Sequence, residues 1–208
     1  MGKLPAKKAV REIPERVLRK FGAVVVRFNK GDTIFREGDS AQAFFIVRRG
    51  QVKMVNSGED GREFVQGYFA DGESFGEPPF FTEDRYPAAA ISVIPSEIWS
   101  IGRKDFLRLL KDNFEIHLEL TRALGLRLIY KSIMLSEIAI EEAEHRVRTL
   151  LKYLGENSKK EGTGVFPFSR QQLADMSGLR VETVIRTIKN LEMKKIVKLT
   201  KDGKILLD

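Results

Sequence analysis

Short apolar runs separated by glycines fill the first half of the chain. Between residues 23 and 101, β-branched and aromatic residues gather in six runs, and glycines lie between or beside them, several next to Asp or Glu. Turn signals at such regular spacing are typical of antiparallel barrels and jelly rolls rather than of βαβ units. We therefore predict a small antiparallel β-roll with strands near residues 24–26, 33–35, 44–47, 52–55, 63–65 and 98–101.

From residue 103 to residue 140 the apolar residues instead recur three or four positions apart, which predicts helix. The stretch 114–140 has no proline and one glycine, and it is apolar on two sides. One side can cover the β-roll while the other meets a partner helix. The alternative is a helix buried within its own monomer, but a second domain follows at once and leaves little chain to bury it. We therefore favour a dimer, with its interface along Leu120, Leu124, Leu128, Leu135 and Ile138.

The last third of the chain predicts short helices. A helix after residue 141 buries apolar residues up to Leu154 and ends near Gly155, and the polar stretch 155–164 follows as a loop. Ser169 and Gln172 then fit a capping box, which starts a helix that ends at Gly178. After a short turn, a second helix from about residue 181 buries Val184, Ile188 and Leu191.

Two apolar runs at 196–199 and 204–207 flank Asp202 and Gly203, a hairpin turn signal, so the end of the chain predicts a winged helix-turn-helix. The predicted fold class is α+β: an N-terminal antiparallel β-roll of jelly-roll type, a long dimerisation helix and the C-terminal winged helix-turn-helix. We place the divisions at residues 1–112, 113–140 and 141–208.

The amino-acid composition excludes several classes of protein and of cofactor site. Hydrophobic residues make up 42% of the 208 residues, which is enough for a core, and no apolar run approaches the roughly 20 residues that cross a bilayer. No secretory signal is recognisable, so we expect a cytoplasmic protein without a membrane partner. The chain has no Cys, which excludes disulfides, thiolate zinc sites and cysteine-ligated iron–sulfur clusters. The only two His, His117 and His145, lie far apart in predicted helices and are expected to be ordinary helix residues.

The formal charge of +7 is unevenly distributed. Residues 1–30 carry 9 basic and 2 acidic side chains, residues 31–140 carry 13 and 17, and residues 141–208 carry 14 and 10. Basic ends fit a polyanionic partner such as DNA, although a modest excess is equally common on solvated surfaces.

Two side chains of the second short helix form a candidate reading head. Glu182 and Arg186 lie four residues apart on the face opposite the buried stripe, near the end of the helix that meets base edges in a helix-turn-helix. Arginine donates to O6 and N7 of guanine, glutamate accepts from N4 of cytosine, and Ile185 can contact a thymine methyl. A solvent-exposed ion pair is the alternative, but the position favours DNA reading. The candidate phosphate contacts are Arg170, Arg180, Thr183, Lys189, Lys201 and Lys204.

The whole chain resembles the family of the cyclic-AMP receptor protein and the fumarate-nitrate regulator, the CRP/FNR transcription factors. The matching segments are the strand-glycine-strand at 44–52, Phe75-Gly76-Glu77 of the phosphate-binding cassette, and the reading helices at 169–174 and 181–186. The resemblance implies a homodimer on a pseudo-palindromic operator in double-stranded DNA, an effector in each β-roll, and RNA polymerase as a partner. It also implies that Glu182 and Arg186 are the base-reading residues, on half-sites with a TGA core. Ile185 departs from the serine of the fumarate-nitrate branch.

The resemblance also locates an effector pocket, and the sequence departs from it there. Gly76 and Glu77 match the cassette, but Tyr86-Pro87 replaces the arginine-serine pair that clamps the cyclic phosphate, and Arg85 lies one residue too early. Proline has no hydroxyl and no backbone donor, and tyrosine carries no charge, which argues against cyclic AMP. On the central helix, Lys131-Ser132 aligns with the adenine-contacting pair, and the lysine is again a departure.

The effector therefore stays unidentified. Aromatic residues near the cassette could surround another small molecule or a haem, but no residue stands out as a haem ligand. One alternative is a regulator that binds DNA without any ligand, its pocket filled by its own side chains. A more distant one is a cupin-like metal enzyme, although residues 23–101 contain no His to hold the metal. We identify no catalytic residue and no metal site, since the adjacent carboxylates at 59–60 and 83–84 fall in polar loops.

Overall fold

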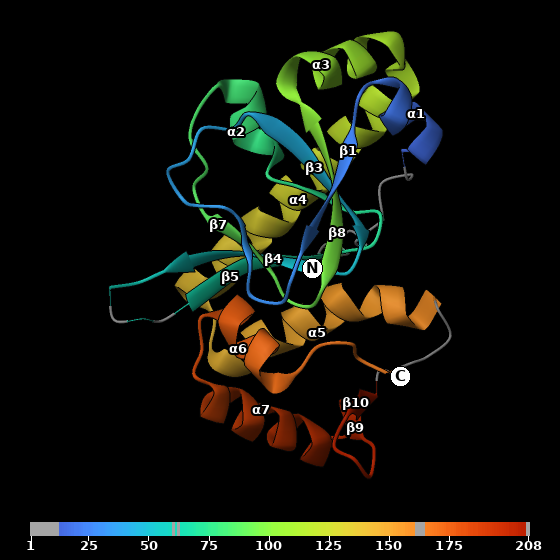
Figure 1. Cartoon of the computed structure of the whole chain (residues 1–208). Helices are drawn as coiled ribbons and strands as arrows, with labels where there is room; N and C mark the ends of the chain where they lie inside the picture. The colour runs from blue at the N-terminus through green and yellow to red at the C-terminus, as the bar shows by residue number, and fades with distance from the viewer. Residues whose placement is uncertain (1–12, 60, 62, 161–164, 207–208) are drawn as a thin grey trace. The chain divides into compact units, whose positions relative to one another are not determined.

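The structure, a computed structural model, describes residues 13–59, 61, 63–160 and 165–206. The chain divides into two compact units, Ala9–Ala123 and Leu124–Asp208 (Figure 1). The first unit holds the strands β1 to β8 and the helices α1 to α3, and the second holds the helices α5 to α7 and the short hairpin β9–β10; α4 begins in the first unit and ends in the second.

The first unit is the predicted antiparallel β-roll. One four-stranded sheet has the order β1-β8-β3-β6 and the other β2-β7-β4-β5, and all pairs are antiparallel. The six predicted strands are confirmed, and two more are present. The strands are β1 (Val24–Phe28), β2 (Thr33–Phe35), β3 (Ala43–Arg49), β4 (Gln51–Ser57), β5 (Glu63–Ala70), β6 (Ser74–Phe75), β7 (Ala89–Ser92) and β8 (Ser96–Gly102).

The core lies between the two sheets and continues under α3 (Arg103–Asp112). Val47 of β3 and its partner Ile98 of β8 lie on one face of the sheet, Phe44 lies on the other face of β3, and all three are fully or almost fully buried. The ring of Phe44 stacks on Phe106 of α3 with 3.7 Å between ring centroids. This stack fixes the helix against the end of the roll.

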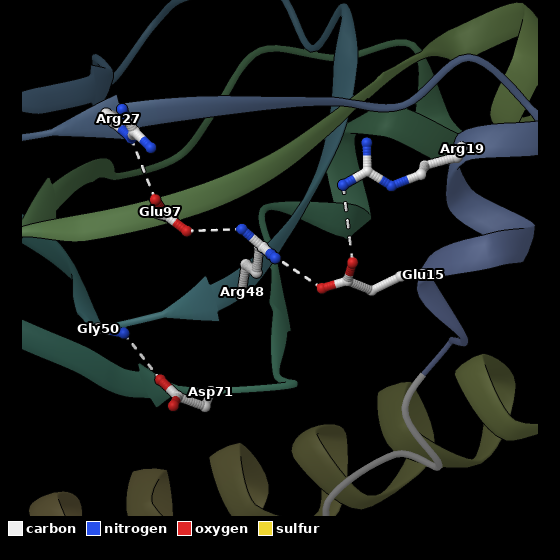
Figure 2. A network of polar contacts seen from close by, with 7 residues as sticks. All are labelled: Glu15, Arg19, Arg27, Arg48, Gly50, Asp71 and Glu97. Atoms are coloured by element: carbon white, nitrogen blue, oxygen red, sulfur yellow. Dashed lines mark hydrogen bonds and ion pairs between the residues drawn. The ribbon is translucent and has the colours of Figure 1, made fainter.

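Helix α1 (Glu15–Lys20) is fastened to the sheet by a chain of ion pairs (Figure 2). The guanidinium of Arg48 lies between two carboxylates, with Nε 2.8 Å from Oε1 of Glu15 and Nη1 2.8 Å from Oε2 of Glu97. Arg27 of β1 reaches the other oxygen of Glu97 at 3.1 Å. Hydrogen bonds and charges from Arg27 and Arg48 hold the pKa of Glu97 below its usual value. Each pair is exposed and weak alone, but together they give α1 one docking position.

A glycine is required where β3 turns into β4. Gly50 has φ +119°, and a Cβ at this position would lie 2.2 Å from Oγ of Ser96. Its N–H donates to Oδ1 of Asp71 at 2.7 Å, as Figure 2 shows. The backbone therefore passes too close to β8 for any side chain.

The helical region differs from its prediction in two places. The apolar pattern from 103 to 140 contains a break at Asn113, which separates α3 from α4 (Phe114–Ile140). The Asn113 side chain donates to the carbonyl of Leu109 at 2.8 Å and so occupies an end carbonyl of α3. The following helix, α5 (Ala143–Lys160), was predicted to end near Gly155, but it continues through that glycine.

The second unit contains the predicted winged helix-turn-helix. Helix α6 (Arg170–Ser177) starts with the full capping box of Ser169 and Gln172, and Gly178 ends it in the left-handed conformation with φ 66°. Helix α7 (Val181–Met193) follows after the turn, and α5 packs on both (Figure 1). The wing is the pair β9 (Lys198–Leu199) and β10 (Ile205–Leu206). Among the described residues, no helix is both long and apolar enough to cross a membrane.

Candidate functional site

Helix α7 presents one face to solvent. Val184, Ile188 and Leu191 are buried, as predicted, and they hold the helix against the rest of the second unit. The opposite face carries exposed side chains of the types that read DNA bases, namely Glu182, Ile185, Arg186 and Lys189. The sequence predicted which face of α7 is buried and which is exposed, because the buried apolar positions recur at helical spacing.

The start of α7 adds two predicted contacts. Arg180 is the exposed N-cap residue, and Thr183 is half-buried in the first turn. Unsatisfied N–H groups at a helix start favour anions such as phosphate, and an arginine there adds charge. The face as a whole therefore combines candidate base contacts with candidate phosphate contacts at the start of the helix.

Arg170 differs from the other predicted phosphate contacts. It is the first residue of α6 and is half-buried, and its Nη2 donates to the carbonyl oxygen of Gly203 in the wing at 2.8 Å. Burial lowers the pKa of this guanidinium, while the charge of Glu192 acts in the opposite direction. The side chain is therefore directed at the wing backbone. Sequence reasoning gave no signal for this contact between residues 33 positions apart.

The predicted dimer residues of α4 separate into three groups. Leu128 and Leu135 are 67% and 70% exposed, whereas Leu124 and Ile138 are half-buried. Leu120 is only 2% exposed and so lies on the buried side of the helix, away from the exposed leucines. The exposed apolar face of α4 instead continues through other residues at heptad spacing, namely Phe114, Leu118, Gly125, Leu128, Leu135 and Ala139.

A polar cluster that the sequence did not predict joins α4 to α5. Glu137 of α4 is buried, and its Oε2 lies 2.6 Å from Nδ1 of His145. Its Oε1 accepts a hydrogen bond from Thr149 at 2.9 Å. Further along, Tyr130 stacks on Tyr153 with 4.0 Å between centroids, and burial raises the pKa of Tyr130. The two helices therefore run back along each other, with both carboxylate oxygens of Glu137 satisfied.

The cassette is tightly built around Gly76. This residue has φ 75°, and a Cβ here would lie 3.0 Å from the Phe35 ring and 3.2 Å from the Tyr86 ring. Glu77 follows at the start of α2 (Glu77–Thr82) and is only 2% exposed. The two cassette residues predicted from the sequence are thus together in the interior of the first unit, and aromatic rings cover the glycine.

Tyr86 is one of those rings and is only 3% exposed. It stacks on Phe35 with 3.7 Å between centroids, and its hydroxyl donates to the carbonyl of Ala43 at 3.3 Å. Burial, with the negative charges of Glu77 and Asp39, raises the pKa of Tyr86 to about 12. The phenol is therefore held neutral against the cassette.

Arg85 is directed away from that interior. It is exposed, its backbone pairs with Ser40, and its Nη1 donates to the carbonyl of Gly38 at 2.7 Å. Neighbouring residues in an extended segment alternate sides, so the burial of Tyr86 fixes the outward direction of Arg85.

The remaining two predicted pocket residues lie in the second unit. Ser132 donates its hydroxyl to the carbonyl of Leu128 at 3.0 Å, within its own helix. Burial, together with the charge of Arg127, lowers the pKa of Lys131. Within the described part of the chain, no group of three or more His, Cys, Asp or Glu side chains could hold a metal ion.

Comparison with known proteins covers both units. The cyclic nucleotide-binding domain model matches residues 25–113, and the Crp-like helix-turn-helix domain model matches residues 145–208. The cyclic AMP receptor protein of Thermus thermophilus is 30% identical over 174 residues, which are 83% of this chain and 78% of that protein. The cAMP-activated global transcriptional regulator CRP of Pasteurella multocida is 29% identical over 171 residues, which are 80% and 81% of the two chains.

Among solved structures, the c-di-GMP responsive global regulator CLP of Xanthomonas campestris superimposes with a TM-score of 0.74 at 24% identity. The match covers 94% of this chain and 100% of that one, and at this identity it supports the fold. These relatives are regulators of transcription, not enzymes, which removes the cupin-like metal enzyme as an alternative.

Proposed function

From the premise that this chain belongs to the CRP/FNR family of transcription regulators, we propose that it is a homodimer that reads a pseudo-palindromic operator. The family membership provides an effector-binding domain and a DNA-binding helix-turn-helix. The exposed face of α7, the exposed face of α4 and the packing around Gly76 support, in turn, the operator contacts, the dimer interface and the state of the effector cassette.

The exposed face of α7 carries the proposal of DNA reading. We assign Arg186 to O6 and N7 of a guanine, Glu182 to N4 of a cytosine and Ile185 to a thymine methyl. Lys189, Thr183 and Arg180 contact phosphates on either side of these bases. Since a two-fold dimer places two such helices in successive major grooves, the half-sites are about 34 Å apart.

The dimer forms along the exposed face of α4. Phe114, Leu118, Leu128 and Leu135 supply its large apolar residues, and the smaller Gly125 and Ala139 between them allow close approach of two helices. A two-fold axis pairs this face with itself, which satisfies the closed symmetry that most homodimers have. In this arrangement α4 is the dimerisation helix that separates an effector domain from a DNA-binding domain.

For the effector cassette we propose that Tyr86 takes the place of the ligand phosphate clamp and that cyclic AMP does not bind. The supporting observation is the stack of Tyr86 on Phe35 against Gly76, with Arg85 directed outward. A neutral phenol there offers no charge to an anionic ligand. The relatives named above are cAMP-activated or c-di-GMP responsive. The packing of Tyr86 favours either a different effector or a regulator that needs none.

As a regulator of transcription, the protein acts on DNA in the cytoplasm, and we expect RNA polymerase to be its protein partner.

Operator selection from a randomised duplex library tests the proposal. The account predicts enrichment of an inverted repeat with TGA-type half-sites whose centres are about one helical turn, roughly 34 Å, apart. The Arg186→Ala variant, selected in parallel, should lose the guanine preference at one position of each half-site and keep the spacing. Enrichment of no motif by the unmodified protein would contradict the proposed function.

A further inference from the structure

The wing of the second unit is a small element with two attachment points. Strands β9 and β10 have two residues each, and the turn between them is closed by hydrogen bonds from Gly203 to Thr200 and from Thr200 to Lys204. A hairpin of this size has little stability of its own. Its orientation therefore depends on what holds it from outside.

The base of the wing is held by the segment before α6. The N–H of Phe166 donates to the carbonyl of Ile205 at 2.8 Å, and Val165 pairs with Leu206. Phe166 is buried, so this attachment is also fixed by packing. It leaves the tip at residues 201–203 outside the paired region.

The tip is held by Arg170. Its Nη2 donates to the carbonyl of Gly203 at 2.8 Å, and it extends from the first position of α6, where the capping box fixes the backbone. Burial lowers the pKa of this half-buried guanidinium, while the negative charge of Glu192, near the end of α7, interacts favourably with it and acts to raise the pKa. One side chain thus connects the start of α6 and the wing tip, close to the end of α7.

The tip carries the charges that a wing needs to contact DNA. Lys201 and Lys204 are exposed on either side of Asp202 and Gly203. The Lys204 ammonium lies 3.3 Å from Asp202, which partly neutralises a carboxylate that would otherwise repel phosphates. Whether the two lysines reach a phosphate depends on the direction of a tip only a few residues long.

We propose that Arg170 is a positioning residue, which holds the wing tip through the Gly203 carbonyl so that Lys201 and Lys204 contact the DNA backbone. This inference rests on the proposed DNA-binding function. It changes the role expected from the sequence, in which Arg170 contacts a phosphate directly.

A mutant cycle on the whole 208-residue chain separates the two roles. Operator affinity is measured by fluorescence anisotropy at several salt concentrations for Arg170→Met, for Lys201→Ala/Lys204→Ala and for the triple variant. Methionine keeps the length of the arginine without its donors. If Arg170 acts through the lysines, the first two variants each bind about tenfold more weakly. The triple variant then binds no more weakly than the lysine double variant, because coupled residues are not additive.

A direct phosphate contact predicts different results. The loss of operator affinity caused by Arg170→Met would then add to the loss caused by the lysine double variant. Arg170→Met would also lower the slope of log affinity against log salt by about one, whether or not the lysines are present. Arg180→Met is the matched control, since Arg180 is exposed at the N-cap of α7 and should be additive with the lysine variant. An unchanged affinity of the lysine double variant would also overturn the proposal.

Hydrogen exchange of the free protein checks the contact without DNA. The amides of Gly203 and Lys204 should exchange faster in Arg170→Met while the amides of α7 keep their protection. Equal exchange at the wing would refute the positioning role. If the unmodified protein binds no operator, the proposed function fails, and this exchange experiment still decides whether Arg170 holds the wing. A thermal unfolding curve for each variant identifies a loss of folding.

Discussion

The exposed leucines of α4 allow the dimer to be tested with a defined perturbation. Replacing Leu128 and Leu135 by glutamate places four carboxylates in the proposed interface, two from each protomer. Both positions are exposed in the single chain, so the substitutions leave the packing of the monomer unchanged. We expect the double variant to be monomeric at concentrations where the unmodified protein is a dimer.

The size of the effect follows from the exposed areas. Complete burial of a leucine side chain contributes about 1.5–3 kcal/mol. Because Leu128 and Leu135 are 67% and 70% exposed before association, each can contribute about two thirds of this, or about 1–2 kcal/mol. Four such leucines in a two-fold dimer amount to about 4–8 kcal/mol, and about 4 kcal/mol already corresponds to a thousandfold change in the dissociation constant.

Sedimentation equilibrium or light scattering over a range of concentrations measures this change. Ile94→Glu is the matched control, because it places the same charge on an apolar residue that is 47% exposed in the first unit, outside α4. The control should dimerise like the unmodified protein. A Leu128→Glu/Leu135→Glu variant that stays dimeric would refute the assignment of this face.

Three further predictions concern the DNA-binding helices and the cassette. Arg186→Ala should lower operator affinity by about 1–3 kcal/mol and relax the preference at one base pair; an unchanged binding profile on a panel of operator variants would exclude the guanine contact. The pKa of Tyr86 is raised from 10.0 to about 12 in the folded protein, so its contribution to stability is complete below pH 10 and is lost as the pH rises to 12. Denaturant unfolding at pH 9 to 12 should therefore show a steeper loss of stability for the unmodified protein than for Tyr86→Phe, and parallel curves would mean that the phenol is not buried against the cassette. Ser169→Ala should cost about 1 kcal/mol of unfolding free energy, since it removes one half of the capping box, and a loss no larger than the experimental error would contradict that geometry.

Much of the fold could be predicted because its signals are local. The capping box at Ser169, the glycine at 178 and the apolar spacing of α7 each act within a few residues, and the structure has the helices where these signals place them. Six strands were likewise visible as apolar runs. Strands β6 and β7 were missed because one has two residues and the other is rich in alanine, which has no strong preference for strands.

The features that could not be predicted depend on contacts between distant residues. Gly155 costs a helix about 1 kcal/mol, yet α5 continues through it to Lys160. Leu120 belongs to the same sequence stripe as Leu128, and only the fold shows that it is buried. The link from Arg170 to Gly203 and the stack of Tyr86 on Phe35 join segments far apart in the chain, for which the sequence has no periodic signal.

Fluorescence anisotropy with a labelled palindrome tests the central claim most directly. The duplex carries two half-sites with a TGA core, and the protein is titrated at fixed salt with and without cyclic AMP. The account predicts specific binding that competes with unlabelled operator but not with a scrambled duplex, and an identical curve in the presence of cyclic AMP. Binding that appears only with the nucleotide would contradict the closed cassette, and equal binding to the operator and the scrambled duplex would contradict the reading of bases by Glu182 and Arg186.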